Sequence, residues 1–133
     1  MDTLLIEPTA QTPKIDFNSD TGVMYIKGRS IPDIADDFWG QILDWFELYL
    51  TNPNEETIFK INFEYFNVSS SKKVLALLYK LNELTNQNKK VSVKWHYRDG
   101  DENMFEVGQD LAYMIHVPFE FKAEQEKDFA LAI

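Results

Sequence analysis

The feature that most constrains this chain is an alternation of apolar and polar residues within two segments, 57–66 and 91–97. The apolar positions are Phe59, Ile61, Phe63, Tyr65, Val91, Val93, Trp95 and Tyr97. The polar positions between them include Lys60, Asn62, Glu64, Lys94 and His96. A period of two is typical of a strand with one buried face. Because strands covered on both faces are apolar throughout, we predict helices mainly on one face of the sheet.

Helical stripes separate these strands. Ser30-Ile31-Pro32-Asp33 matches a Ser-x-x-acid cap, so a first helix is expected from there to about Leu50. A second helix is expected from near Ser69, with its apolar stripe continuing to Leu84, and a third after Asp99-Gly100. The apolar stripes expected on the three helices include Ala35, Phe38, Trp39, Ile42, Phe46, Tyr49, Val74, Leu77, Leu78, Leu81, Leu84, Met104, Val107, Leu111 and Ile115.

Shorter apolar runs complete the expected fold. Residues 3–6 suit a short strand and residues 118–121 a last strand, and the runs at 15–17 and 23–27 suit a hairpin because turn-forming residues separate them. Alternating strands and helices favour parallel βαβ units. We therefore predict one α/β domain over residues 1–133, with a mixed sheet made of an antiparallel hairpin followed by parallel strands. Residues from about 123 to 133 are expected to fray.

Composition excludes several classes of function. The 133 residues carry a net charge of -9, which disfavours binding to nucleic acid and to anionic lipid. The chain contains no cysteine, so disulfides and thiol chemistry are excluded. No apolar run approaches the length of a membrane span, and the N-terminus lacks the basic region of a signal peptide. We expect a cytoplasmic protein without membrane insertion.

The chemistry-bearing residues do not form a complete catalytic motif. The C-terminal ends of parallel strands share one edge of the sheet, and this would bring Ser69, His96 and Asp99 into one neighbourhood. Together they would be the catalytic residues of a small Ser-His hydrolase, which is the alternative function. The Gly-x-Ser-x-Gly elbow is absent, however, and His96 alternates onto the open face. The acidic turn at 99–102 lacks the register of a calcium loop and suits a helix start. We expect no catalytic residues, no metal and no cofactor.

Four stretches, taken in order, carry a resemblance to a known family. They are residues 6–13, residues 25–32, Tyr65-Phe66-Asn67-Val68-Ser69-Ser70, and residues 93–97 with Asp101-Glu102 and Gly108-Gln109-Asp110. Together they resemble the SiaC family of regulatory phosphoproteins over nearly the whole chain. The resemblance implies a STAS-like fold, similar to that of anti-sigma-factor antagonists. It also implies a non-enzymatic regulator that binds and activates a diguanylate cyclase. In the family, a kinase and a phosphatase switch this regulator by adding and removing a phosphate.

One departure from the family pattern concerns the switch itself. The family places a threonine, its expected phosphoacceptor, where this chain has Val68. Either Ser69 or Ser70 is the phosphoacceptor in place of the threonine, with Ser71 a further candidate, or this protein is a constitutive scaffold that is not phosphorylated here. We favour Ser69, because it carries the next hydroxyl of the motif. The residues expected to contact the partner are Asn67, Val68, Ser69, Lys72, Leu75 and Tyr79.

A partner surface is also suggested by apolar residues that fall off the main helical stripes. These are Ile34, Trp45 and Leu48 in the first helix, and Leu75 and Tyr79 in the second. Leu75 and Tyr79 are four residues apart and hence neighbours on a helix. Such residues either form an apolar docking surface or are buried by adjacent elements, and the sequence leaves both alternatives open.

Overall fold

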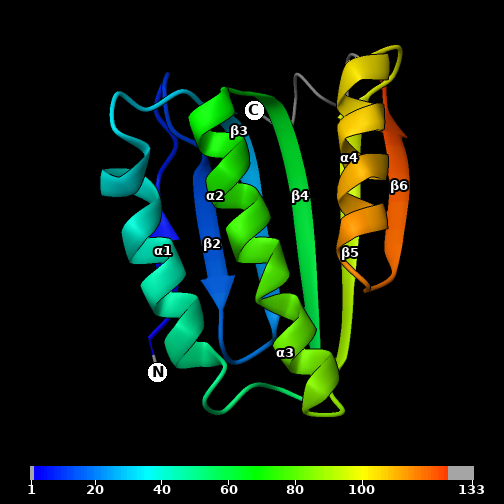
Figure 1. The fold of residues 1–133 in the computed structure, drawn as a ribbon. Helices are drawn as coiled ribbons and strands as arrows, with labels where there is room; N and C mark the ends of the chain where they lie inside the picture. The colour runs from blue at the N-terminus through cyan, green and yellow to red at the C-terminus, as the bar shows by residue number, and fades with distance from the viewer. Residues whose placement is uncertain (1, 126–133) are drawn as a thin grey trace.

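The computed structural model describes residues 2–125, which form a single mixed sheet and four helices (Figure 1). The strands are β1 (Leu4–Ile6), β2 (Lys14–Asn18), β3 (Val23–Ser30), β4 (Glu56–Phe66), β5 (Lys90–Arg98) and β6 (Phe119–Glu124). The helices are α1 (Ala35–Tyr49), α2 (Val68–Tyr79), α3 (Leu81–Asn86) and α4 (Glu102–Met114). No helix in the described part of the chain is long and apolar enough to cross a membrane.

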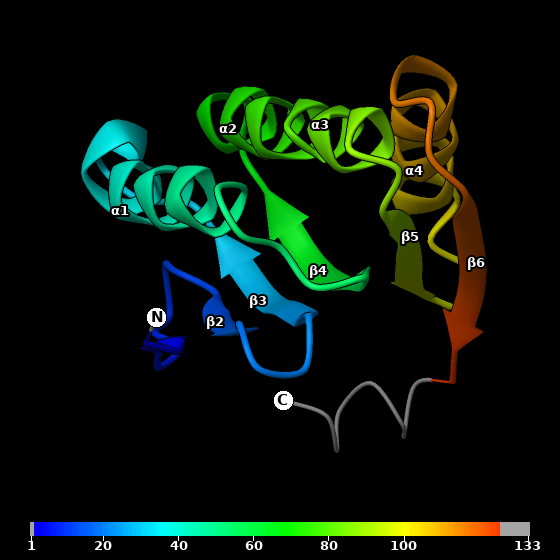
Figure 2. The same ribbon diagram turned by 90° about the horizontal axis from the view of Figure 1, so that it is seen from below.

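The order of the strands across the sheet is their order in the chain, β1 to β6. The first three pair antiparallel, and β3 to β6 pair parallel. Because the parallel strands advance in one direction, right-handed crossovers place every helix on the same side. Figure 2 shows this arrangement, with all helices on one side of the sheet. The predicted mixed sheet with helices on one face is therefore confirmed.

The core lies between the helices and the apolar face of the sheet. Trp39 and Phe46 of α1, Leu77 of α2, and Phe59 and Trp95 of the central strands are all inaccessible to solvent. The other face of the sheet, here called the open face, carries the polar alternation, including Lys60, Asn62, Lys94 and His96. The period of two in the sequence thus separates the core from the open face.

A bulge in β4 interrupts the predicted alternation. Gly28 pairs with Phe63 but Arg29 pairs with Tyr65, so Glu64 is an extra residue in β4. The extra residue shifts the alternation, because two residues of β4 then face one of β3. Tyr65 is exposed, and Phe66 packs against Phe63 in its place, with ring centroids 4.9 Å apart. The expectation that Tyr65 lies in the core was wrong.

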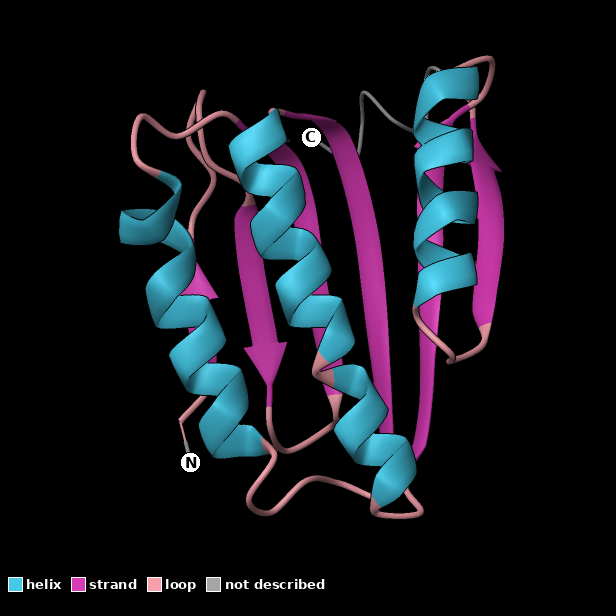
Figure 3. Cartoon of the chain, in the orientation of Figure 1, coloured by secondary structure: helices cyan, strands magenta, loops and turns pink. Residues whose placement is uncertain are grey.

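The helix boundaries also differ from the expected ones. α1 begins at Ala35 and its cap residue, Ile34, makes no side-chain capping bond. The predicted cap at Ser30 is wrong, because Ser30 is the last residue of β3 and pairs with Phe66. The apolar stripe expected on one second helix is divided between α2 and α3, which meet at Lys80 (Figure 3). The stripe itself is buried as expected.

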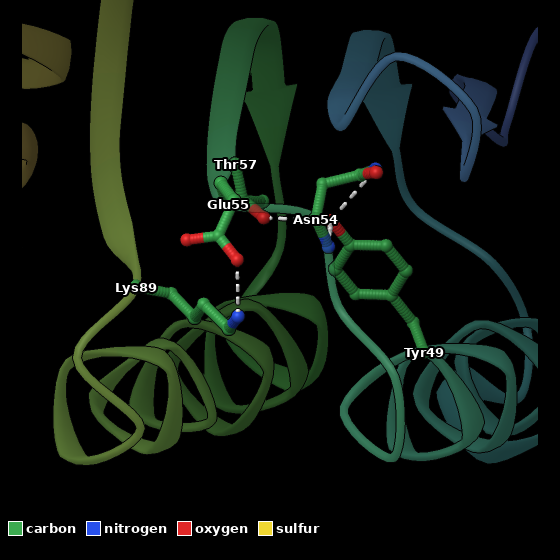
Figure 4. A network of polar contacts seen from close by, with 5 residues as sticks. All are labelled: Tyr49, Asn54, Glu55, Thr57 and Lys89. Carbon is green, nitrogen blue, oxygen red and sulfur yellow. Dashed lines mark hydrogen bonds and ion pairs between the residues drawn. The ribbon is translucent and has the colours of Figure 1, made fainter.

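A polar network fixes the C-terminal end of α1 to the start of β4 (Figure 4). The Tyr49 hydroxyl and Thr57 Oγ1 are 2.7 Å apart. The backbone amide of Asn54 donates to the same Tyr49 hydroxyl at 3.2 Å. Lys89, just before β5, forms an ion pair with Glu55 at 2.6 Å. These contacts satisfy polar groups in the crossover from α1 to β4, and so position both elements.

The C-terminal strand is longer than expected. Ala123 and Glu124 continue β6 and pair with Tyr97 and Arg98 of β5. The expected fraying therefore does not begin at residue 123, and the rest of that expectation, residues 126–133, lies outside the described residues.

Candidate functional site

The ends of β3 and β4 meet the start of α2, as the shared edge of parallel strands requires. Asn67 is the cap of α2: its Oδ1 accepts a bond from the Ser70 amide at 2.9 Å. The Asn67 amide in turn donates to the Ser30 carbonyl at 3.0 Å. Capping by Asn67 leaves Ser69 in the first turn of the helix without a capping role. Ser69 therefore lies at the N-terminal end of α2, as the sequence predicts.

A buried pair of serines supports this corner of the molecule. Ser70 Oγ lies 2.7 Å from Ser30 Oγ and donates to the Ser30 carbonyl at 3.0 Å. Trp39 Nε1 of α1 donates to Ser30 Oγ at 3.2 Å. All three residues are fully buried. The contacts join β3, α1 and α2, so they set where the first turn of α2 lies. Sequence reasoning missed this role, because the two serines are 40 residues apart.

Ser70→Ala should test this support. The change removes a buried hydroxyl and leaves Ser30 with fewer partners, so we expect a loss of about 1–3 kcal/mol in the free energy of unfolding. Denaturant unfolding followed by tryptophan fluorescence measures the loss. Ser71→Ala is the matched control, because the Ser71 hydroxyl donates to the Val68 carbonyl of its own helix, and it should change stability by less than about 0.5 kcal/mol. Equal stability of the two variants would contradict the supporting role.

Ser69 faces a shallow groove between the N-terminal ends of α1 and α2. The groove has a volume of about 400 Å³. Its lining consists of Asp33, Ile34, Ala35, Asp36, Ser69, Lys72 and Lys73. Lys73 forms an ion pair with Asp36 across it. The Ser69 side chain is exposed, in contrast to that of Ser70. A hydroxyl in this position is accessible to another protein, and the first helical turn beside it has backbone donors outside the helical ladder.

Beside the groove, one outward row runs along α2. Val68, Lys72, Leu75 and Tyr79, here called the α2 stripe, follow one another at spacings of three and four residues. The exposed fraction is 74% for Val68 and 45% for Tyr79. Leu75 is half-buried. The structure therefore brings the predicted partner-contacting residues onto one surface, with Asn67 at its end.

The other residues off the main stripes divide between burial and exposure. Trp45 packs on Phe17, with centroids 5.5 Å apart, and donates to the Asp2 carbonyl at 2.9 Å. Ile34 and Leu48 are exposed. Of the two alternatives left open by the sequence, partial burial against the core holds for Trp45, and exposure holds for Ile34 and Leu48.

The hydrolase constellation does not form. His96 Nδ1 lies 2.6 Å from Glu124 Oε1, on the open face, whereas Ser69 lies in the groove between the helices. Within residues 2–125 no group of three or more His, Asp or Glu side chains is arranged to hold a metal ion. The acidic turn is a helix start as predicted: Asp101 caps α4 by accepting from the Met104 amide at 3.1 Å.

The one-sided mixed sheet, with an exposed serine at the start of α2, defines a single-domain α/β protein. A family model described as the SiaC family regulatory phosphoprotein matches residues 6–124. The chain therefore belongs to the SiaC family.

Relatives of the chain come from Pseudomonas aeruginosa. An uncharacterised protein of strain UCBPP-PA14 is 29% identical over 126 residues, which are 95% of this chain and 100% of that protein. The crystal structure of apo-SiaC is 28% identical, covers 92% of this chain and 100% of its own, and has a TM-score of 0.85. This chain is also similar to a chain in the crystal structure of the diguanylate cyclase SiaD in complex with its activator SiaC. That match has 28% identity, a TM-score of 0.86 and coverage of 91% of this chain and 99% of that one.

Proposed function

We propose that this protein is a non-enzymatic cytoplasmic regulator that binds and activates a diguanylate cyclase, and that phosphorylation of Ser69 releases the cyclase. Membership of the SiaC family supports the regulatory role, and the solved complex of a relative with a cyclase supports the partner. The observation that carries the proposal is the exposed Ser69 beside the α2 stripe. A kinase and a phosphatase that act on this serine are the further partners.

The three serines differ in how well they suit a kinase. Ser70 is fully buried and bonded to Ser30, so modification would require the corner to open. Ser71 Oγ donates to the Val68 carbonyl at 2.6 Å, which holds the hydroxyl against the helix. Ser69 combines exposure with a place in the groove. Val68 fills the space of the family threonine without its hydroxyl, which leaves Ser69 as the acceptor that we favour.

The α2 stripe supports a protein partner through its chemistry. Val68 and Tyr79 are large exposed apolar side chains, and Lys72 lies between them. An aromatic anchor with a neighbouring cation is common at protein interfaces. A cyclase surface that covers Lys72 would also cover Ser69, because the two residues line the same groove. Binding and phosphorylation would then compete for one surface.

Tyr79→Ala tests the interface. We expect it to weaken binding to the purified cyclase by about tenfold or more, the typical effect of removing an interface tyrosine anchor. Isothermal titration calorimetry measures the affinity. Tyr113→Ala is the matched control, because Tyr113 is 86% exposed on α4, away from the α2 stripe, and should leave affinity unchanged. Equal losses in the two variants, or no binding by the wild-type protein, would contradict the proposal.

A further inference from the structure

The open face carries like-charged neighbours that a water-exposed sheet normally avoids. Lys60 of β4 is in register with Lys94 of β5, and Lys14 of β2 is in register with Lys27 of β3. Like charges side by side on neighbouring strands are destabilising. The chain has nine excess negative charges, so carboxylates are not scarce. Two such pairs on one face indicate a local positive potential that the fold maintains.

The protein neutralises these lysines only in part, through Glu120, which is in register with Lys94, and Glu124, whose charge acts on Lys27. Within residues 2–125, none of Lys14, Lys27, Lys60, Lys94 and Lys122 forms an ion pair. Lys27 is only 9% exposed. Burial lowers the pKa of Lys27, and the neighbouring charge of Lys14 lowers it further, while Glu124 opposes both effects. The open face therefore offers cations that an anion from outside the chain would stabilise.

Two adjoining hollows lie on this face. The smaller, of about 240 Å³, is lined by Lys60, Lys94, His96, Glu120 and Lys122. It contains three lysines and one carboxylate, so its charge suits a phosphate group. The hollows share Lys60 and His96, so one elongated ligand can occupy both.

The larger hollow has a different chemistry. Its volume of about 430 Å³ lies in the range of small-molecule sites. The carboxylates of Asp16 and Glu124 supply acceptor oxygens, of which Glu124 Oε1 already contacts His96, while Tyr25 and Val23 supply flat or apolar surface. An organic group that carries hydrogen-bond donors would match this lining.

Asn62 is an independent sign of a ligand at the larger hollow. Its side chain lines the hollow but is only 5% exposed, and its Oδ1 has no hydrogen-bond partner in the described part of the chain. A buried polar atom without a partner costs free energy, and such atoms are rare in native proteins. A half-turn of the amide exchanges its oxygen and nitrogen, so either group can meet a ligand. We take Asn62 to be a binding residue.

We propose that the open face binds a small organic phosphate, with the phosphate over Lys60, Lys94 and Lys122 and a donor-bearing head group beside Asn62. A nucleoside monophosphate has this chemistry and a suitable size. Guanosine 5′-monophosphate is the first probe, because guanine offers N–H donors to the acceptor oxygens of the larger hollow. The site lies on the face of the sheet opposite the helices, so it is independent of the groove at Ser69.

The first experiment compares the affinity of the protein for the nucleotide with its affinity for the separate parts of the nucleotide. Backbone amide shifts of the ¹⁵N-labelled protein are followed during titration with guanosine 5′-monophosphate, guanosine, ribose 5-phosphate and inorganic phosphate. We expect the nucleotide to bind at least about tenfold more tightly than guanosine or inorganic phosphate, with shifts in β3, β4 and β5. Equal affinity for ribose 5-phosphate would assign the site to sugar phosphates and keep the proposal. Equal affinity for inorganic phosphate, or no shifts on the open face with any probe, would overturn it.

Charge-matched variants test the phosphate end. Lys94→Gln should weaken nucleotide binding by about tenfold, because it removes one charged contact. Lys80→Gln makes the same charge change at the junction of α2 and α3, outside both hollows, and should leave affinity within about twofold. Equal weakening in both variants would show that net charge alone is responsible, and would overturn the site.

Asn62→Leu separates a binding role from a structural one. The change replaces a buried amide without a partner by an apolar side chain of similar volume. We expect a higher melting temperature together with loss of nucleotide binding, because binding residues are often not optimal for stability. A stable variant that binds the nucleotide as tightly as wild type would overturn the role of Asn62. If the variant does not fold, Lys94→Gln still tests the site.

Discussion

Ser69→Asp is expected to weaken cyclase binding by at least about tenfold while the fold stays intact. The Ser69 side chain is exposed in the groove, and acidic residues are stabilising in the first turn of a helix. The partner, in contrast, would have to desolvate a charge where it now meets a neutral hydroxyl. Calorimetric titration with the cyclase measures the change, and circular dichroism checks the fold. Affinity equal to wild type would contradict a regulatory role for position 69.

The kinase provides the complementary experiment. Ser69→Ala should keep cyclase binding and lose labelling, while the control Ser71→Ala keeps both. A phosphate carries nearly two negative charges at pH 7, so the modified wild-type protein should bind more weakly than Ser69→Asp. Labelling of Ser69→Ala at the wild-type level would assign the acceptor to another serine. If no serine from 69 to 71 is labelled, the protein is a constitutive scaffold and the switch proposal is wrong.

Gly108→Ala is expected to destabilise the protein by about 2–3 kcal/mol and to lower its melting temperature by about 5–10 °C. A Cβ at Gly108 would lie 2.5 Å from Trp95 Nε1 and 2.9 Å from Phe121 Cε1. Trp95 cannot move away cheaply, because it is fully buried and its Nε1 donates to the Met104 carbonyl at 3.0 Å. The methyl group must therefore push α4 away from the sheet. Differential scanning calorimetry measures the loss.

Gly40→Ala is the matched control for this effect. Gly40 also lies within a helix, but a Cβ there would meet nothing within 4 Å. Alanine has the higher helix propensity, so we expect a gain of about 0.5–1 kcal/mol. The same substitution in two helices should thus change stability in opposite directions. A destabilised Gly40→Ala, or a neutral Gly108→Ala, would contradict the packing explanation.

Local patterns were sufficient to predict the architecture. The alternation of Lys60, Asn62 and Lys94 with apolar residues predicts a sheet covered on one face, since side chains of a strand point to opposite sides in turn. The resemblance around Asn67 to Ser70 led to the family, which the family model confirms over residues 6–124. Helical spacing also predicts that Leu75 and Tyr79 share one side of their helix.

Predictions failed where a distant residue decides the outcome. The Ser-x-x-acid pattern at Ser30 indicates a helix cap, yet pairing with β4 keeps Ser30 in a strand. Glu64 looks like an ordinary strand position, but its register against β3 makes it a bulge and exposes Tyr65. Neither contact can be read from neighbouring residues, because each depends on a strand more than thirty positions away.

The sequence by itself determined the order of the strands and helices, the faces of the sheet and the presence of serines at the start of α2. These depend on periodicity and on the chemistry of adjacent residues. Only the tertiary structure decided which serine is accessible, since Ser70 is buried by Ser30 and Trp39 while Ser69 is left in the groove. It also placed the lysines of five strands on one face, with Asn62 among them. Accessibility and charge clustering arise from residues distant in sequence, so they exist only once the chain has folded.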